Sequence, residues 1–312
     1  MSQSFVLDLN SFFNYGKSPL IITLMGPTAS GKTELAINLA QHLGLSILSI
    51  DSRQLYSEME VGTTQPTTIQ RDSINHELLG LRSPDNPVNL QEFIKLASGI
   101  IRKEHERCGV AFLVGGSGLY LKALTNGICP PAVPPHINLR VQLRLIGEQS
   151  CSDLLQVTDP VSSDRIESND TLRIERALEV MYTTGKPLSI QQSQIYPSWR
   201  LLELGLDPPT LRQRIQKRSI LLYTQGLIEE TRRLINRYGY DLPLLKTIGY
   251  GEICRWMVGE IDLKIALIIT IHRTLQYAKR QRTWFYHQHE VLWLNEANPL
   301  EHALIAAEHV LG

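Results

Sequence analysis

The segment LMGPTASGKTEL, residues 24–35, contains residue types and spacings that suit phosphate binding. Gly26, four further residues and the run from Gly31 to Thr33 match the full phosphate-binding-loop pattern. In such a loop, the backbone N–H groups of residues 28–33 would surround an anion at the positive end of a helix. The lysine, Lys32, would add a positive charge, and the threonine hydroxyl can hold Mg²⁺. The pattern therefore predicts a phosphate site.

The acid that would complete a nucleotide-hydrolysing site is not where that chemistry needs it. ATPases and GTPases end a second strand in Asp to hold the metal, whereas the segment AFLVGG (111–116) ends in two glycines. An acid instead ends the segment LSILSID (45–51), at Asp51. That position, at the carboxyl end of a strand, suits a base that accepts a proton from a nucleophile. An Asp that caps the next helix or orients Mg²⁺ would occupy the same position, so position alone leaves both interpretations open.

Short apolar runs and one helical period provide the elements that must position these groups. Residues 20–25 (LIITLM) read as a buried strand, and apolar side chains then recur with helical spacing from Lys32 to a stop at Gly44. Further buried strands are predicted within 45–51 and 109–116. Strands that alternate with helices form parallel βαβ units. We therefore predict an α/β fold, a P-loop NTPase-like parallel sheet with helices on both faces.

The pattern of predicted secondary structure changes near Cys129. Four prolines in CPPAVPPHINLR break regular structure, and residues 138–190 then read as helices without buried strands. Strand patterns return at 199–209 and at 291–295. The predicted organisation is an N-terminal tail (1–19), a P-loop α/β core (20–128 and 199–312) and a helical insertion domain (129–198).

Composition narrows the class of protein. Apolar residues make up 43% of the 312 residues, which is enough for a large core. The 31 basic residues balance the 31 acidic ones, so a nucleic-acid partner would need a local basic patch. The cysteines are sparse and unpatterned, as in a reducing compartment, and no apolar run reaches the roughly 20 residues of a membrane helix. We expect a soluble cytoplasmic protein that acts as a monomer, without a signal peptide.

Basic residues gather in two segments that contain no acid, RQRIQKR (212–218) and HRTLQYAKRQRTWFYH (272–287). Basic residues beside aromatic ones suit phosphate contact and base stacking. A solvated face with an aromatic contact to the core is the alternative interpretation. The predicted insertion adds further arginines: Arg140, Arg144, Arg165, Arg173 and Arg176.

Taken together, several segments resemble the tRNA dimethylallyltransferases, also called tRNA isopentenyltransferases. The resemblance extends from about residue 20 to about residue 295. It rests on GPTASGKTELA, DSRQLYSEMEVGTTQP, FLVGGSGLYLKAL, NDTLRIERALEVMYTTGK, IGYGEI and RTLQYAKRQRTW. The family transfers a dimethylallyl group from its diphosphate to N6 of the adenosine just 3′ of a tRNA anticodon. The resemblance thus implies this activity, the tRNA anticodon stem-loop and dimethylallyl diphosphate as partners, and Mg²⁺ as cofactor; without a zinc-finger pattern, we expect the bacterial form.

The resemblance also implies roles for single residues. Asp51 takes the place of the family's general base, and Ser117 stands where the family usually has Thr. The implied catalytic residues are Asp51, Lys32 and Arg218. The implied diphosphate-binding residues are Gly26, Pro27, Thr28, Ala29, Ser30, Gly31, Lys32, Thr33 and Arg218, with Thr33 also holding the metal. The implied tRNA-binding residues are Asp51, Ser52, Arg53, Gln54, Ser117, Arg140, Leu172, Arg173, Ile174, Glu175 and Arg176.

Two segments depart from the family pattern, and two other functions stay open. NHELLG (75–80) and GYGE (249–252) differ from the usual residues, and we expect effects on local contacts only. A P-loop small-molecule kinase would hold ATP in the loop and use Asp51 on a hydroxyl group, but the two glycines and the basic segments argue against it. An RNA-binding module with a decayed nucleotide site conflicts with the intact Lys32, Thr33 and Asp51.

Overall fold

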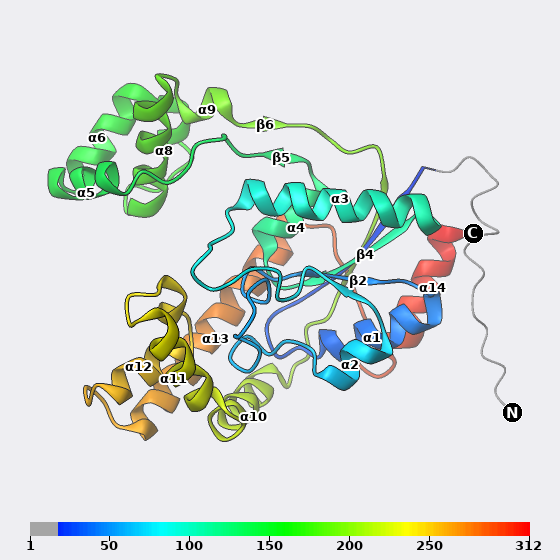
Figure 1. Ribbon diagram of the computed structural model, residues 1–312. Coiled ribbons are helices and arrows are strands. Elements are labelled where there is room, and N and C mark those ends of the chain that lie inside the picture. Colours follow the sequence, from blue (N-terminus) through cyan, green and yellow to red (C-terminus); the bar gives the residue numbers. More distant parts are fainter. Residues whose placement is uncertain (1–17) are drawn as a thin grey trace, which may run out of the picture. The chain divides into compact units, whose positions relative to one another are not determined.

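A computed structural model of the protein describes residues 18–312, which divide into two compact units (Figure 1). One unit comprises the described residues up to Thr125 together with Ser198–Gly312, and the other is Asn126–Pro197. The second unit is therefore an insertion in the chain of the first. The expected tail at 1–19 lies outside the described residues, apart from its last two. Within the described part of the chain, no helix is long and apolar enough to cross a membrane.

A six-stranded parallel sheet forms the centre of the first unit, in the order β3-β2-β4-β1-β7-β8. Its strands are β1 (Leu20–Met25), β2 (Ile47–Ile50), β3 (His76–Glu77), β4 (Val110–Gly115), β7 (Arg200–Gly205) and β8 (Leu292–Trp293). Every residue of β1, β2 and β4 is buried, which explains why these segments are continuous apolar runs without alternation. The predicted α/β fold is confirmed, and all the strands expected from the sequence are present.

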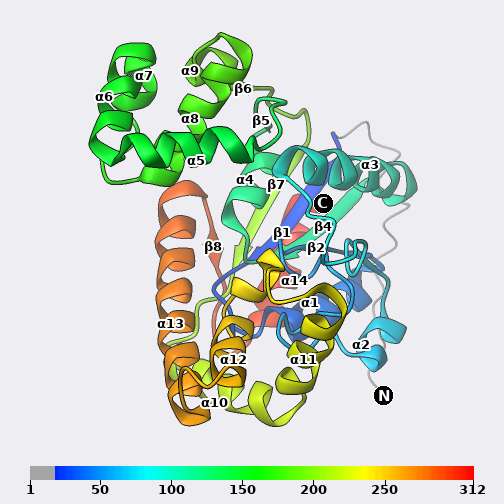
Figure 2. The same ribbon diagram turned by 60° about the vertical axis from the view of Figure 1, so that its left-hand side comes forward.

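Helices cover both faces of this sheet (Figure 2). Leu20, Ile22 and Leu24 of β1 pack in one apolar cluster with α1 and α14, whereas Ile21 and Met25 pack in a second cluster with α3, α4, α11 and α12. This alternation follows from the two-residue period of a strand. The helices are α1 (Lys32–Leu43), α2 (Thr68–Ser73), α3 (Leu90–Cys108), α4 (Gly118–Thr125), α10 (Leu211–Thr224), α11 (Leu227–Tyr238), α12 (Tyr250–Met257), α13 (Leu263–Gln288) and α14 (Pro299–Leu311), with a 3-10 helix, η2 (Pro243–Lys246).

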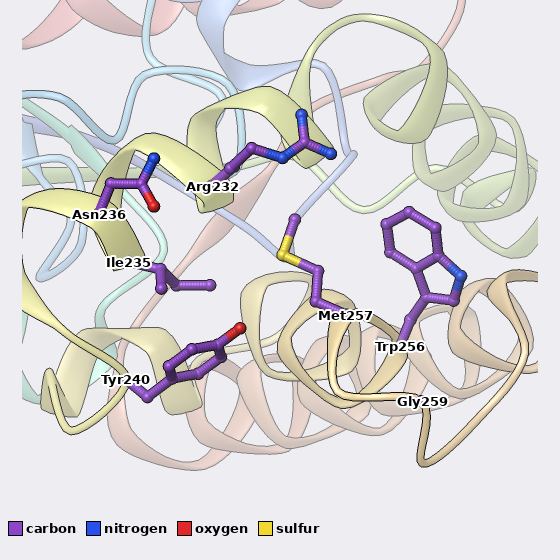
Figure 3. Close-up of a pocket in the computed structure, with 7 residues that line it drawn as sticks. All are labelled: Arg232, Ile235, Asn236, Tyr240, Trp256, Met257 and Gly259. Carbon is purple, nitrogen blue, oxygen red and sulfur yellow. The ribbon is translucent and has the colours of Figure 1, made fainter.

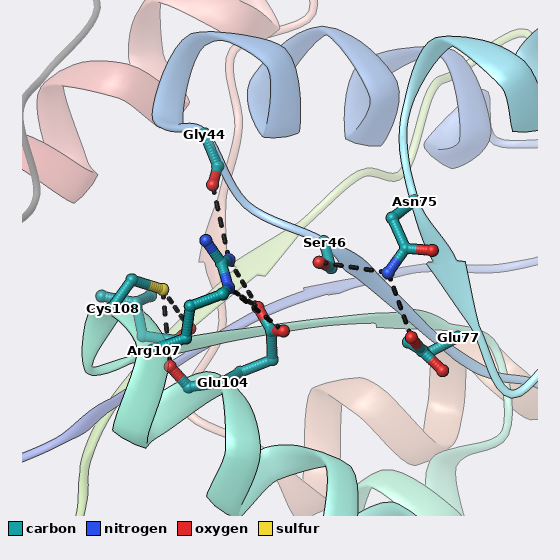
Figure 4. Close-up of polar contacts among 8 residues, drawn as sticks. Gly44, Ser46, Asn75, Glu77, Glu104, Arg107 and Cys108 are labelled. Atoms are coloured by element: carbon teal, nitrogen blue, oxygen red, sulfur yellow. Dashed lines mark hydrogen bonds and ion pairs between the residues drawn. The ribbon is translucent and has the colours of Figure 1, made fainter.

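Polar contacts tie the elements together at the edge of the sheet where β2 and β4 begin (Figure 4). The Arg107 side chain, near the end of α3, pairs with Glu104 at 2.6 Å and reaches the Gly44 carbonyl that follows α1. Asn75 similarly joins Ser46 to Glu77. Since none of the predicted site residues lies at this edge, we assign it a structural role.

The second unit is a small helical bundle. Its core is formed by side chains that include Leu143, Cys151, Leu155, Ile174 and Leu178. The helices are α5 (Ile137–Ile146), α6 (Glu148–Thr158), α7 (Pro160–Ser163), α8 (Thr171–Thr184) and α9 (Leu188–Gln191). A short antiparallel pair, β5 (Ile128–Cys129) and β6 (Ser193–Gln194), was not predicted, because two-residue strands carry no periodic signal.

Candidate active site

The carboxyl ends of the central strands bring the predicted loop and the predicted base to one edge of the sheet. The phosphate-binding loop follows β1, Asp51 follows β2, and the turn that contains Ser117 follows β4. Parallel pairing of β2 and β1 with β4 aligns these ends, with Ile50 and Met25 both paired with Gly115. This is the edge at which open α/β sheets bind ligands.

Both glycines of the loop are required by its geometry. Gly26 has φ 153°, and a Cβ there would lie 2.3 Å from the Leu206 carbonyl oxygen after β7. Gly31 has φ 100°, just before α1 begins, and Ala29 also adopts a left-handed conformation. A loop of this shape exposes successive backbone N–H groups at a helix N-terminus, where an anion is stabilised.

Lys32 is partly buried and is hydrogen-bonded to the loop. Its Nζ donates to the carbonyl oxygens of Gly26 at 2.8 Å and Pro27 at 2.7 Å. Burial, and then the positive charge of Arg218, lower the pKa of Lys32 to about 7, while the charge of Asp51 opposes this shift. An anion bound in the loop would restore the preference of Lys32 for the protonated form.

Arg218 reaches the loop from α10, as the sequence implied. Its Nη1 donates to Thr28 Oγ1 at 3.1 Å, and its Nη2 donates to Thr64 Oγ1. Arg214, one turn earlier on α10, donates to the Ser30 carbonyl oxygen at 3.2 Å. Arg214 was not among the residues predicted from the sequence, although its four-residue spacing from Arg218 placed both on one helix face.

Asp51 is held beside this cationic group. Its Oδ1 accepts a hydrogen bond from the Arg53 N–H at 2.8 Å. The next residue, Ser52, donates its N–H to Ser117 Oγ at 3.1 Å, so the hydroxyl of Ser117 fixes the backbone next to Asp51. The negative charge of Asp51 acts on Lys32 and opposes the fall in that side chain's pKa.

Gln54 supports the site from within its own loop. Its side chain accepts from Ser49 Oγ at 2.9 Å and donates to the carbonyl oxygens of Thr63 and Thr64 at 3.2 and 3.1 Å. Thr64 is the residue that receives Arg218. The amide of Gln54 thus connects β2 to the segment that fixes the arginine.

The GYGE segment anchors the same loop from its other side. The buried Tyr250 hydroxyl donates to Glu230 at 2.6 Å. Glu230, itself 1% exposed, accepts from the N–H groups of Val61 at 2.8 Å and Gly62 at 2.9 Å. The departure from the family pattern therefore leaves in place a tyrosine that holds the segment leading to Thr64.

The two glycines after β4 leave no room for an acid. A Cβ on Gly115 would lie 2.0 Å from the Ile50 carbonyl oxygen, and a Cβ on Gly116 would lie 2.4 Å from Gln281 Nε2. The backbone of Ile50 therefore excludes the metal-holding Asp of nucleotide-hydrolysing enzymes from position 115, and a side chain at position 116 would displace the Gln281 amide. Gln281, on α13, also accepts from the Thr28 N–H at 2.8 Å, so this amide of the predicted anion cradle already has a partner.

In the second unit, several of the residues implied to bind tRNA form ion pairs with other residues of the same unit. Arg140 and Arg176 both pair with the buried Glu179, at 2.8 and 2.5 Å. Burial would raise the pKa of Glu179, but hydrogen bonds from these arginines and from the His136 N–H lower it to about 2. The contacts of this carboxylate therefore hold α5 against α8.

The other residues of the second unit that were implied to bind tRNA are either buried or exposed. Ile174 is only 2% exposed and belongs to the unit's core, and Glu175 is buried and pairs with Arg144 at 2.8 Å. Leu172 is 70% exposed, and the Arg173 side chain is 65% exposed. The surface at the start of α8 is thus formed by Leu172 and Arg173.

The residues available for a metal are oxygen donors. Among the described residues, no group of three or more His, Cys, Asp or Glu side chains could hold a metal ion. Thr33 is exposed in the first turn of α1. A hydroxyl at this position fits Mg²⁺, which takes few protein oxygens and completes its coordination with substrate phosphates and water.

A pocket of about 450 Å³ lies elsewhere, between α11 and α12 (Figure 3). It is lined by Arg232, Ile235, Asn236, Tyr240, Trp256, Met257 and Gly259. None of these is a predicted site residue, so the pocket is separate from the arrangement at the sheet edge.

Comparisons with known proteins bear on the family and the fold. Residues 54–288 match the family of IPP transferases. A tRNA dimethylallyltransferase from Parasynechococcus marenigrum is 54% identical over 293 residues, 94% of this chain and 98% of that protein. The tRNA isopentenylpyrophosphate transferase of Bacillus halodurans is 30% identical, with a TM-score of 0.69 over 93% of this chain and 97% of that one. A eukaryotic dimethylallyltransferase acting on tRNA has the same fold, with a TM-score of 0.77 at 24% identity, over 93% of this chain and 78% of that one.

Proposed function

The chain belongs to the IPP transferase family, and we infer that it is a tRNA dimethylallyltransferase. It transfers a dimethylallyl group from dimethylallyl diphosphate to N6 of the adenosine just 3′ of the tRNA anticodon. The observation that best supports this chemistry is the meeting of a phosphate loop, Arg218 and Asp51 at a sheet edge where β4 ends in glycine. Such a site stabilises a leaving diphosphate and offers a base.

Stabilisation of the leaving group is the first requirement of the reaction. The amine nitrogen forms a bond to the allylic carbon, the bond from that carbon to oxygen breaks, and diphosphate leaves with the electron pair. The developing charge would be met by N–H groups at the start of α1, by Lys32 and by Arg218. Thr33 would hold Mg²⁺, which supplies further positive charge to the diphosphate.

Asp51 would act on the nucleophile. An exocyclic amine is a weak nucleophile, and it loses a proton as its bond to carbon forms. Asp51 would accept that proton as a general base. The bonds from the Arg53 N–H to Asp51, and from the Ser52 N–H to Ser117, support this role because they fix the carboxylate's direction.

The adenosine must leave the anticodon stack before it can react, at a cost of a few kcal/mol. The exposed surface formed by Leu172 and Arg173 could offset this cost by contacting the RNA. Ser52, Arg53 and Ser117 would contact the target nucleotide beside Asp51. We further propose that the enzyme acts in the cytoplasm, a reducing compartment that its free cysteines fit. We also propose that it acts as a monomer.

The proposal is tested with recombinant protein, Mg²⁺, unmodified tRNA and dimethylallyl diphosphate. Mass spectrometry of digested tRNA should show one dimethylallyl addition on the adenosine next to the anticodon. A tRNA with guanosine at that position is the matched control and should remain unmodified. Consumption of ATP with a hydroxyl acceptor would instead support a kinase, and tRNA binding without turnover would support an RNA-binding module.

A further inference from the structure

The long helix α13 can be followed in Figures 1 and 2. Its residues Tyr277, Gln281 and Trp284 are spaced at i, i+4 and i+7, so they share one face of the helix. Burial, and then the charge of Asp51, raise the pKa of Tyr277. A Cβ on Gly118 would lie 2.1 Å from the Trp284 ring, so α13 packs closely against the first residue of α4. Gln281 lies between Tyr277 and Trp284 on the helix.

The Gln281 amide is buried, and both of its ends are used. Its Oε1 accepts the Thr28 N–H at 2.8 Å, and its Nε2 donates to the Gly116 carbonyl oxygen at 2.8 Å. The residue is 7% exposed. A buried amide with two satisfied groups is held in one orientation, because turning it over would place donor against donor and acceptor against acceptor.

These two bonds join the two halves of the site. The N–H that Gln281 binds belongs to Thr28, whose hydroxyl accepts Arg218. The carbonyl that it binds belongs to Gly116, next to Ser117, whose hydroxyl holds the Ser52 backbone beside Asp51. A shift of the Gln281 amide would therefore move the diphosphate cradle and the support of the base together.

We propose that Gln281 is a positioning residue for the transfer reaction, and this rests on the proposed function. Its amide fixes the position of the phosphate loop relative to the turn after β4. Because both ends of its amide bond the protein backbone, we assign it no direct contact with substrate. It acts through Thr28 on the orientation of Arg218 toward the diphosphate, and through Gly116 on the loop of Asp51.

The test replaces Gln281 by Met, which keeps the length of the side chain and removes both hydrogen bonds. Transfer kinetics should show a roughly tenfold rise in the KM for dimethylallyl diphosphate, with the KM for tRNA within about twofold. Calorimetry with inorganic diphosphate should show a similar loss of affinity without any turnover. Gln41→Met is the matched control, because Gln41 is exposed on α1, the helix that follows the loop, and this variant should match the unmodified protein.

A second variant tests the same proposal if the Gln281→Met variant is unstable. Gln281→Glu has the same size but as a carboxylate cannot donate to Gly116, whereas its protonated form can. Relative to the unmodified protein at each pH, this variant should therefore regain affinity for inorganic diphosphate as the pH falls.

Failure of the inference and failure of the function are distinguishable. Unmodified protein that transfers no dimethylallyl group would overturn the function. Active protein whose Gln281→Met and Gln281→Glu variants bind inorganic diphosphate normally would overturn the positioning role. Loss of diphosphate and tRNA affinity together, alongside a lower Tm in both variants, would also overturn it by making Gln281 a general packing residue.

Discussion

Lys32 shows how a single residue links the fold to a measurable property. Its ammonium donates to the carbonyls of Gly26 and Pro27, and burial and Arg218 lower its pKa to about 7. A bound diphosphate favours the protonated lysine and therefore raises this pKa. Below pH 7 Lys32 already carries its proton, whereas above pH 7 Lys32 must take up a proton when diphosphate binds.

This linkage predicts that affinity for inorganic diphosphate falls as the pH rises above about 7, by at most roughly tenfold per pH unit from this residue. Calorimetry in two buffers of different ionisation enthalpy measures the proton uptake directly. The Lys32→Met variant should bind inorganic diphosphate more weakly and should lose the part of the proton uptake that Lys32 contributes. The difference between the two proteins therefore separates the proton taken up by Lys32 from the protons taken up by diphosphate itself. Equal uptake by both proteins at pH 8 would show that Lys32 is not the group involved.

Asp51 is expected to act on the chemical step more than on binding. Asp51→Asn preserves the size of the side chain and its acceptor for the Arg53 N–H, but removes the base. The kcat should fall roughly 10²- to 10⁴-fold while the Kd for tRNA changes little. Parallel loss of tRNA binding in a filter-binding assay would instead make Asp51 a residue that shapes its loop.

At the residue scale, a motif predicts a position but not the contacts of a side chain. The phosphate-loop pattern predicted where Lys32 and Thr33 lie, since a strand and a helix fix their backbone. The sequence could not show that Gln281, far along the chain, takes the Thr28 N–H. Nor could it show that Gln54 turns into its own loop, because glutamine is most often exposed.

Among the elements, β2 and β4 pack against each other closely where β4 ends in glycine. Gly115 has no space for a side chain, whereas Gly99, on α3, has nothing within 4 Å of the position that a Cβ would take. Gly115→Ala should lower the free energy of unfolding by about 1–3 kcal/mol or more through overpacking. Gly99→Ala should raise it by about 0.5–1 kcal/mol, because alanine favours a helix.

Urea unfolding of both variants measures this difference. If Gly115→Ala proved as stable as the unmodified protein, the strand ends would be farther apart than described, and the explanation for the missing acid would fail.

Elements were predictable where the sequence carries a continuous apolar run or a full helical period. The buried strands β1, β2 and β4 are continuous apolar runs, and α1 ends at a left-handed glycine, Gly44, as expected. The basic segment 272–287 left two interpretations open, a nucleic-acid surface or a solvated face with an aromatic contact to the core. It proved to be part of α13, whose one face carries Gln281 into the site, and neither charge nor composition indicates such a contact.

Across the whole molecule, we assign RNA contact partly to the inserted unit. Arg173 is exposed on α8, and reversal of its charge should weaken tRNA binding without affecting the diphosphate cradle. Arg173→Glu should raise the Kd for tRNA roughly tenfold and flatten its dependence on salt by about one phosphate contact. The KM for dimethylallyl diphosphate should stay unchanged.

Lys103→Glu is the matched control, because Lys103 is exposed near the end of α3, at the sheet edge opposite the site. Equal weakening by both variants would indicate a general effect of net charge, and the proposed contact at Arg173 would be withdrawn.

Fold class was predictable at this scale because βαβ alternation admits few topologies. The inner arrangement of the insertion was not. Arg176 lies off the apolar stripe of its helix, as an RNA-binding residue would, yet it and Arg140 both pair with the buried Glu179. Arg140 is on α5 and Glu179 is on α8, and opposite charges on two helices give no periodic signal that would reveal their pairing in advance.

The proposed mechanism depends above all on a loop that holds a diphosphate which leaves intact. A single-turnover reaction with tRNA, dimethylallyl diphosphate and ATP together, analysed for every phosphate product, measures this directly. We expect one inorganic diphosphate for each dimethylallyl adenosine, with ATP unchanged. Release of orthophosphate or ADP in proportion to product would show that the loop serves another phosphate chemistry.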